Sequence, residues 1–214
     1  MVTQNPSRIF KSDFSVWKKQ DSGIVNEIFS EDKSSVLKAV SEIILEENGS
    51  YLIHYRENSS ILIIVLYGEL MINDFEKPIS TEQVFTLQSS ENNTLFLRNN
   101  LQNEKADFLI FELECETLKN SFSIEDLDIK ERNTLFKITE RIKVPNFIGL
   151  YEGRKEEVYS LYRQGKSVFG MVINGAFEFQ NRLMETRDAI VLTEIETLEF
   201  EALSEDALLL FLVF

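Results

Sequence analysis

The sequence predicts an all-β protein that folds as two antiparallel barrels. Apolar runs of mostly four to eight residues, rich in Ile, Val, Leu and Phe, recur at short intervals along the chain. Such spacing is typical of antiparallel sandwiches and barrels, whereas α/β proteins alternate strands with helices. The expected strands cover residues 24–29, 36–45, 51–56, 61–72, 84–87, 94–97, 108–113, 136–142, 147–151, 157–162, 168–173, 176–179, 189–192, 197–201 and 208–213.

An internal repeat is the second observation behind this prediction. Matching residues recur at a separation that shrinks along the chain: Tyr55-Arg56 and Gly68 match Tyr162-Arg163 and Gly175 at 107, Leu87 matches Leu192 at 105, Thr94-Leu95 match Thr197-Leu198 at 103, and Phe111 matches Phe211 at 100. Shorter loops in the second copy explain the shrinking offset. Two copies of one barrel unit account for the pattern, because fixed-period self-similarity is the signature of repeated architecture.

The repeat places one barrel in residues 1–118 and the other in residues 130–214. Residues 119–129 are acidic and weakly periodic, which is typical of a linker with at most one short helix. Residues 13–17 are expected to form a turn or short helix. The two barrels are expected to form one compact monomer.

Composition disfavours two classes of partner. The net charge of the 214 residues is −14, which disfavours nucleic acid and anionic membranes as partners, because both need Lys and Arg against phosphate. Cys115 is the only cysteine, so no disulfide within the chain is expected. Cys115 is interpreted as a small buried hydrophobic residue. The N-terminus lacks the apolar stretch of a signal peptide, and no apolar run has the length of a membrane span. A reducing cytoplasm is the expected location.

The stretch from Gly49 to Gly68 carries the first family resemblance. Two strand-like runs are joined by the polar turn Glu57-Asn58-Ser59-Ser60 and end on a glycine, with His54 and Arg56 in the first run. This frame resembles the first motif of the cupins, in which a glycine is followed by His-x-His, a glutamate and a second glycine. The stretches Gly149 to Tyr159, Ile173 to Asp188 and Glu199 to Ala207 are similar to the C-terminal cupin of pirin-like proteins, also known as the quercetin 2,3-dioxygenase C-terminal domain. The resemblance implies a bicupin of two jelly-roll barrels.

The resemblance also implies where a metal would bind, and the ligands are missing there. Iron-holding pirins use His-x-His, a further His and a Glu in the N-terminal cupin, with alternate strand residues sharing one face. His54 takes the first position, but Arg56, which stays protonated, takes the second, and Ile61 the glutamate position. Residues 94–98 contain neither His nor Glu, and His54 is the only histidine. The second half has Leu161, Arg163 and Val168 at the corresponding positions. No metal and no other cofactor is therefore expected.

His54 and Arg56 are the candidate remnant pocket. For His54 the alternatives are a ligand-binding residue or a histidine satisfied by its neighbours. The apolar alternation of Tyr51, Ile53 and Tyr55 would bury those residues and expose His54 and Arg56, whereas the family frame points Arg56 into the barrel. We prefer the orientation that the cupin motif implies, called the family frame below. Arg56 is then expected at the mouth of the first barrel, where its charge replaces that of the metal and pairs with a carboxylate or a small anion. Glu112, Glu114 and Glu116 share one strand face; the alternatives are a carboxylate cluster or an exposed strand edge, and the exposed edge is preferred.

Two functions from different classes remain. The favoured one is a pirin-like bicupin that lacks a competent metal site and acts without catalysis, by binding a small ligand, such as an anion, or a protein partner. The alternative is a metal-dependent dioxygenase of the pirin or quercetinase type acting on a flavonol. No catalytic residue can be named, since no nucleophile motif, phosphate loop or acid–base pair is found.

Overall fold

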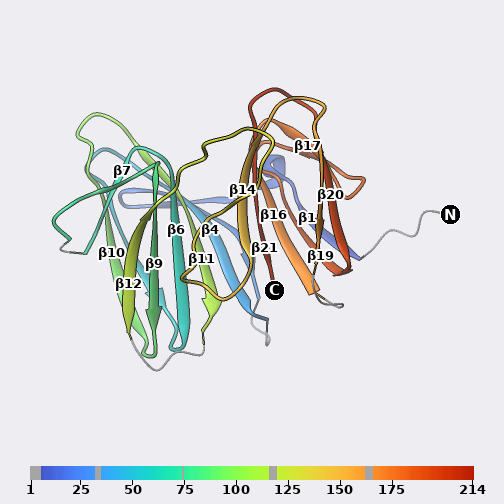
Figure 1. Ribbon diagram of the computed structural model, residues 1–214. Coiled ribbons are helices and arrows are strands. Elements are labelled where there is room, and N and C mark those ends of the chain that lie inside the picture. The colour runs from blue at the N-terminus through green and yellow to red at the C-terminus, as the bar shows by residue number, and fades with distance from the viewer. Residues whose placement is uncertain (1–5, 32–34, 74, 116–119, 162–165) are drawn as a thin grey trace. The chain divides into compact units, whose positions relative to one another are not determined.

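The computed structural model describes residues 6–31, 35–73, 75–115, 120–161 and 166–214 (Figure 1). The all-β prediction is confirmed, since the one helical element in these ranges is a 3-10 turn, Ser12–Phe14. By contacts the chain divides into two units. One comprises Val16–Asp128, and the other comprises Ile129–Phe214 together with the N-terminal residues up to Ser15.

The first barrel, within Val16–Asp128, consists of a seven-stranded and a four-stranded antiparallel sheet. The order in the larger sheet is β12-β9-β6-β11-β4-β3-β2, and in the smaller one β5-β10-β7-β8. The strands are β2 (Trp17–Gln20), β3 (Gly23–Ser30), β4 (Leu37–Leu45), β5 (Ser50–Tyr55), β6 (Ser59–Tyr67), β7 (Glu69–Ile72), β8 (Ile79–Ser80), β9 (Gln83–Ser89), β10 (Asn93–Asn99), β11 (Ala106–Glu114) and β12 (Ser121–Asp126).

The second barrel has the same plan. A six-stranded sheet in the order β1-β19-β16-β21-β14-β13 faces a four-stranded sheet in the order β15-β20-β17-β18. Its strands are β1 (Ser7–Phe10), β13 (Phe136–Lys137), β14 (Asn146–Tyr151), β15 (Glu156–Ser160), β16 (Lys166–Asn174), β17 (Ala176–Phe179), β18 (Leu183–Glu185), β19 (Ala189–Ile195), β20 (Thr197–Ala202) and β21 (Ala207–Val213).

Strand registers confirm the repeat and correct two of its matches. Gly68 and Gly175 both adopt positive φ, +82° and +80°, at the bend between equivalent strands, so the expected single strand over 61–72 breaks there. In the ladders, Ile110 opposite Ile63 corresponds to Phe211 opposite Gly170. Phe211 is therefore equivalent to Ile110, and the match to Phe111 is one residue out of register.

The same correction applies to β5. His54 pairs with Thr94, and Ser160 pairs with Thr197, so β5 and β15 correspond at a separation of 106. The match of Tyr55-Arg56 to Tyr162-Arg163 is therefore also one residue off, and that second pair lies outside the described residues. Because successive strand residues face opposite sides of a sheet, a shift of one residue exchanges inside and outside.

The expected domain boundaries differ from the units of the structure at both ends. The N-terminal strand β1 pairs with β19 of the second barrel, although the sequence placed it in the first. The presumed linker over 119–129 contains β12, which pairs with β9 of the first barrel. These two strands take equivalent places beside β9 and β19, but each barrel receives its strand from a different part of the chain.

A buried carboxylate holds the N-terminal segment against the second barrel. Asp188 is fully buried, forms an ion pair with Lys11 and accepts hydrogen bonds from the backbone N of Ser12 and of Glu185, both at 2.8 Å. Burial by itself would raise the pKa of Asp188, but the hydrogen bonds from Lys11 and the two backbone groups, together with the charge of Lys11, outweigh it and lower the pKa. The same contact raises the pKa of Lys11.

Candidate functional site

A cavity of about 150 Å³ lies inside the first barrel, where the edge strand β5 faces β3, β4, β6 and β11. Its wall is mainly aliphatic and includes Val25, Ile43, Ile53, Ile61 and Ile110. These side chains belong to the core of this barrel or pack against it. The cavity is the candidate site because Ile61, which the cupin resemblance places at the glutamate position, lines it.

The side-chain orientation along β5 determines which of its residues reach this cavity. Tyr55 is buried, and Tyr51 and Ile53 pack against the core, whereas Leu52, His54 and Arg56 are exposed. His54 still borders the cavity from the strand edge. The expectation that Arg56 faces the barrel interior is therefore wrong. Burial of the more apolar face, which the alternation in the sequence had indicated, prevails over the family frame.

The donor set around the cavity does not fit the metal site of a cupin. Ile61, at the glutamate position, does line the cavity, and the inward residues of β10 are Leu95 and Leu97. Among the described residues, no group of three or more His, Cys, Asp or Glu side chains is placed to hold a metal ion. Divalent metal sites in proteins need several such donors around one point.

Glu112 is the charged side chain that the structure does bring to the cavity. It is half-buried, and its Oε1 accepts a hydrogen bond from the buried Ser59 hydroxyl at 2.8 Å and one from the backbone N of Arg56 at 3.1 Å. Its interpretation as part of an exposed edge was wrong, whereas Glu114 is exposed as expected and Glu116 lies outside the described residues. The signal was the alternation Phe108, Ile110, Glu112, which continues the inward face of β11.

Arg56 instead borders a polar groove of about 420 Å³ next to this network. The groove is also lined by Lys38, Glu57 and Glu114, and the Lys38 ammonium lies 3.0 Å from a carboxylate oxygen of Glu114. Among the described residues that line this groove, two cations and two carboxylates balance in charge.

In the second barrel, aromatic rings occupy the equivalent space. The ring centroids of Phe147, Tyr159 and Phe211 lie 5.0 to 5.3 Å apart from one another. Ladder positions make them the counterparts of Ser41, Ile53 and Ile110, since Ser41 pairs with Ile110 as Phe147 pairs with Phe211. The position of Glu112 is taken by Val213. Of the positions compared with metal ligands here, Val168 is buried, Leu161 packs against the core, and Arg163 lies outside the described residues.

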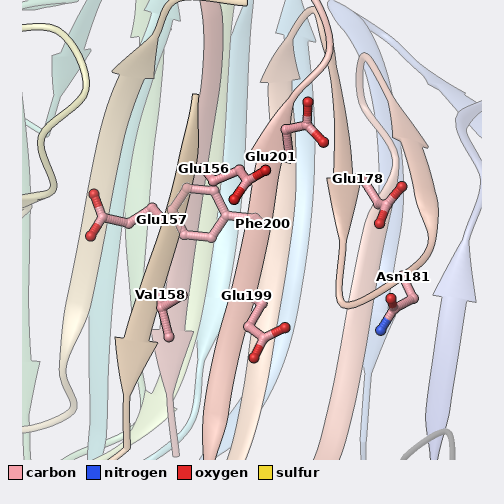
Figure 2. A pocket seen from close by; sticks show the side chains of 8 residues that line it. All are labelled: Glu156, Glu157, Val158, Glu178, Asn181, Glu199, Phe200 and Glu201. Atoms are coloured by element: carbon pink, nitrogen blue, oxygen red, sulfur yellow. The ribbon is translucent and has the colours of Figure 1, made fainter. Parts of the chain in front are cut away.

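The outer face of the small sheet in the second barrel is acidic, as Figure 2 shows. Glu156, Glu201 and Glu178 lie opposite one another on three neighbouring strands, with Glu199 close by. Glu156, Glu178 and Glu199 are exposed, and Arg154 lies 3.5 Å from Glu201. This is a shallow solvated depression with carboxylates as its main polar groups.

These observations define the class of protein. The described strands form two cupin barrels with the same strand order, and the first of them has a half-open, mainly aliphatic cavity lined by Ile61. The recognition of a pirin-like bicupin is confirmed at the level of the fold. Residues 131–213 match the quercetinase C-terminal cupin domain family.

Solved structures agree over nearly the whole chain. YhhW from Escherichia coli superposes with a TM-score of 0.83 at 12% identity, covering 97% of both chains. A complex of the bacterial pirin YhhW with nickel(II) gives 0.81 at 13% identity, covering 97% of this chain and 98% of that one. A quercetin 2,3-dioxygenase from Acinetobacter baumannii gives 0.74 at 13%, covering 98% and 86%. Identities this low establish the fold alone.

No curated protein matches this sequence significantly. Within the described ranges, no helix has the length and apolar character that a membrane crossing would require.

Proposed function

We propose that this protein is a bicupin without a competent metal site that acts by binding a small molecule in its first barrel. The observation that carries the proposal is the composition of the cavity wall. Ile53, Ile61 and Leu95 face inward along the strands that supply metal donors in iron-holding pirins, and none of them offers a donor atom. A cytoplasmic location belongs to this proposal, in keeping with the single, buried Cys115.

The alternative is a metal-dependent dioxygenase of the quercetinase type. Its support is the family match of residues 131–213 and the likeness to a quercetin 2,3-dioxygenase fold. Both features concern the scaffold, whereas the reaction depends on the site. A role through a protein partner is compatible with the proposal, since a cavity that binds a small ligand can regulate a surface contact.

The test compares metal content with turnover. The protein is produced in iron-rich medium, reconstituted with Fe(II) or Ni(II), desalted and analysed for metals. We expect far less than one equivalent, and quercetin consumption equal to a protein-free control. Near-stoichiometric metal that is lost in the variant His54→Ala, together with quercetin turnover, would establish the dioxygenase instead.

A further inference from the structure

We propose that the first-barrel cavity binds a molecule with one aromatic ring and a positively charged hydrogen-bond donor, such as an arylalkyl ammonium. The ring would occupy the aliphatic end of the cavity, and the ammonium would pair with Glu112. This inference rests on the proposed function, because it assigns the chemistry of the ligand to the same cavity.

Size and lining argue for a single ring. The cavity measures about 150 Å³. An apolar protein cavity of about 150 Å³ stays dry and takes up benzene. The part of the wall formed by Val25, Ile43, Ile61 and Ile110 is of that apolar kind, so an aromatic guest there would supply packing contacts that the cavity lacks.

The second barrel shows that rings fit this part of the frame. Its Phe147, Tyr159 and Phe211 form a compact aromatic cluster at the positions where the first barrel has Ser41, Ile53 and Ile110. At these three positions the first barrel therefore lacks the aromatic rings that the second barrel has. The aromatic ring of a ligand would provide some of the packing contacts that the second barrel obtains from its own aromatic side chains.

Glu112 determines the polar end of the ligand. Two donors, the Ser59 hydroxyl and the backbone N of Arg56, converge on Oε1. Among the described residues, no hydrogen bond or ion pair engages Oε2, so this oxygen can accept from a guest. A half-buried carboxylate attracts a cation and repels an anion, and charge-assisted hydrogen bonds are the stronger kind. An anionic ligand, which the sequence suggested, therefore does not suit this cavity.

The experiment measures binding of benzylamine, toluene and benzoate at pH 7 by titration calorimetry and by ligand-detected NMR. We expect benzylamine to bind more tightly than toluene, and benzoate not to bind. Glu112→Gln keeps the shape and the acceptor for Ser59 but removes the charge. It should weaken benzylamine by about tenfold or more, which is the scale of one hydrogen bond to a charged group, and leave toluene within about twofold.

Two further variants make the test specific. Glu114→Gln removes the same charge two residues along β11, from a side chain that pairs with Lys38 and borders the groove. It should leave benzylamine affinity within about twofold, because surface charges contribute little. Ser41→Phe places a ring at the position of Phe147 and should abolish binding of both benzylamine and toluene. Circular dichroism and the melting transition confirm that each variant is folded.

The outcomes separate this inference from the proposed function. If toluene and benzylamine bind equally, or if Glu112→Gln and Glu114→Gln behave alike, the role of Glu112 is overturned. If no probe binds and desalted protein retains no metal, the ligand class is overturned while a barrel without a competent metal site stands. If no probe binds and the protein holds an equivalent of Fe(II) or Ni(II), the proposed function fails as well.

Discussion

The second barrel packs three aromatic rings where the first barrel has two isoleucines and a serine. The residue pairs of the strands around these positions correspond between the two barrels. In each barrel the chain bends between equivalent strands at a glycine with positive φ, Gly68 or Gly175. A Cβ on Gly170 would lie 2.5 Å from the ring of Phe179, whereas the equivalent position in the first barrel is Ile63. Gly170 thus makes room for the ring of Phe179 in the second barrel, whereas the bulkier Ile63 takes its place in the first.

The strand arrangement of a barrel and the side chains at its centre can therefore vary independently. Strand register depends on turn geometry and on the alternation of buried and exposed residues, which both copies retain. The side chains at the centre can then diverge. One copy has become a closed aromatic core, and the other keeps an opening with one carboxylate at its rim.

The largest expected effect is on the aromatic core. Phe211→Ala should lower the free energy of unfolding by about 3–5 kcal/mol, because Phe211 is fully buried and contacts several rings. The equivalent change in the first barrel, Ile110→Ala, should cost about 2 kcal/mol, since Ile110 already borders a cavity. Urea denaturation of both variants measures the difference. Equal losses would contradict the contrast between a filled and an open barrel.

The second prediction concerns the strands that complete each barrel. Asp188→Asn should cost about 2–4 kcal/mol, because it breaks a buried ion pair with the segment that carries β1. Glu185→Gln, an exposed partner of the same Lys11, is the control and should cost less than about 0.5 kcal/mol. The described part of the first barrel shows no matching ion pair: Gln83, at the equivalent position, makes an exposed hydrogen bond at 3.3 Å to Asp126.

The pH dependence of this contact follows from the two pKa shifts. Asp188 has a folded pKa below its ordinary value of 3.8, so its contribution is present above that value and is lost as the pH falls through the folded pKa. Lys11 has a folded pKa above 10.5, so its contribution is present below that value and is lost as the pH rises through the folded pKa. The difference in stability between wild type and Asp188→Asn should therefore be flat near pH 7 and shrink at both extremes.

A third prediction exchanges the filling of the barrels. Ser41→Phe should raise the free energy of unfolding by about 0.5–2 kcal/mol, because it fills a cavity as Phe147 does in the second barrel. The reverse change, Phe147→Ser, should destabilise the protein. Thermal melting measures both. A destabilising Ser41→Phe would mean that the cavity is too rigid or too small for a ring.

The smallest expected effect is at Arg56. Its side chain is exposed, so Arg56→Ala should cost less than about 1 kcal/mol and leave the response to phosphate unchanged. An inward Arg56, as the family frame implied, would instead cost about 2–4 kcal/mol, because its removal would leave a buried acid unpaired. The melting transition distinguishes the two.

Much of the fold could be predicted from local patterns. The all-β class, the repeat and the equivalence of Leu87 with Leu192 follow from apolar spacing, which the strands must obey. The strand β1 was missed because Ser7–Phe10 is short and mostly exposed, and its partner β19 lies far along the chain. The strand β12 was missed for a similar reason, since four of its six residues are exposed.

The site was harder to predict than the fold. The absence of donors at Ile61 and within residues 94–98 could be seen in the sequence, but the facing of β5 could not be settled, because alternation and family frame disagreed by one residue. Glu112 was misinterpreted as part of an exposed edge, because the inward alternation of Phe108 and Ile110 was not extended to it and the cavity beside it is not visible in the sequence. A cavity arises from the combined volumes of strands far apart in sequence, and no local pattern records it.

The most direct measurement of the central contrast is a crystal of this protein pressurised with xenon, which enters dry apolar cavities. The account predicts a xenon atom in the first barrel beside Ile53, Ile61 and Ile110, and none among Phe147, Tyr159 and Phe211 in the second. The site should vanish in Ser41→Phe. An unoccupied first barrel, or equal occupancy of both barrels, would contradict the account.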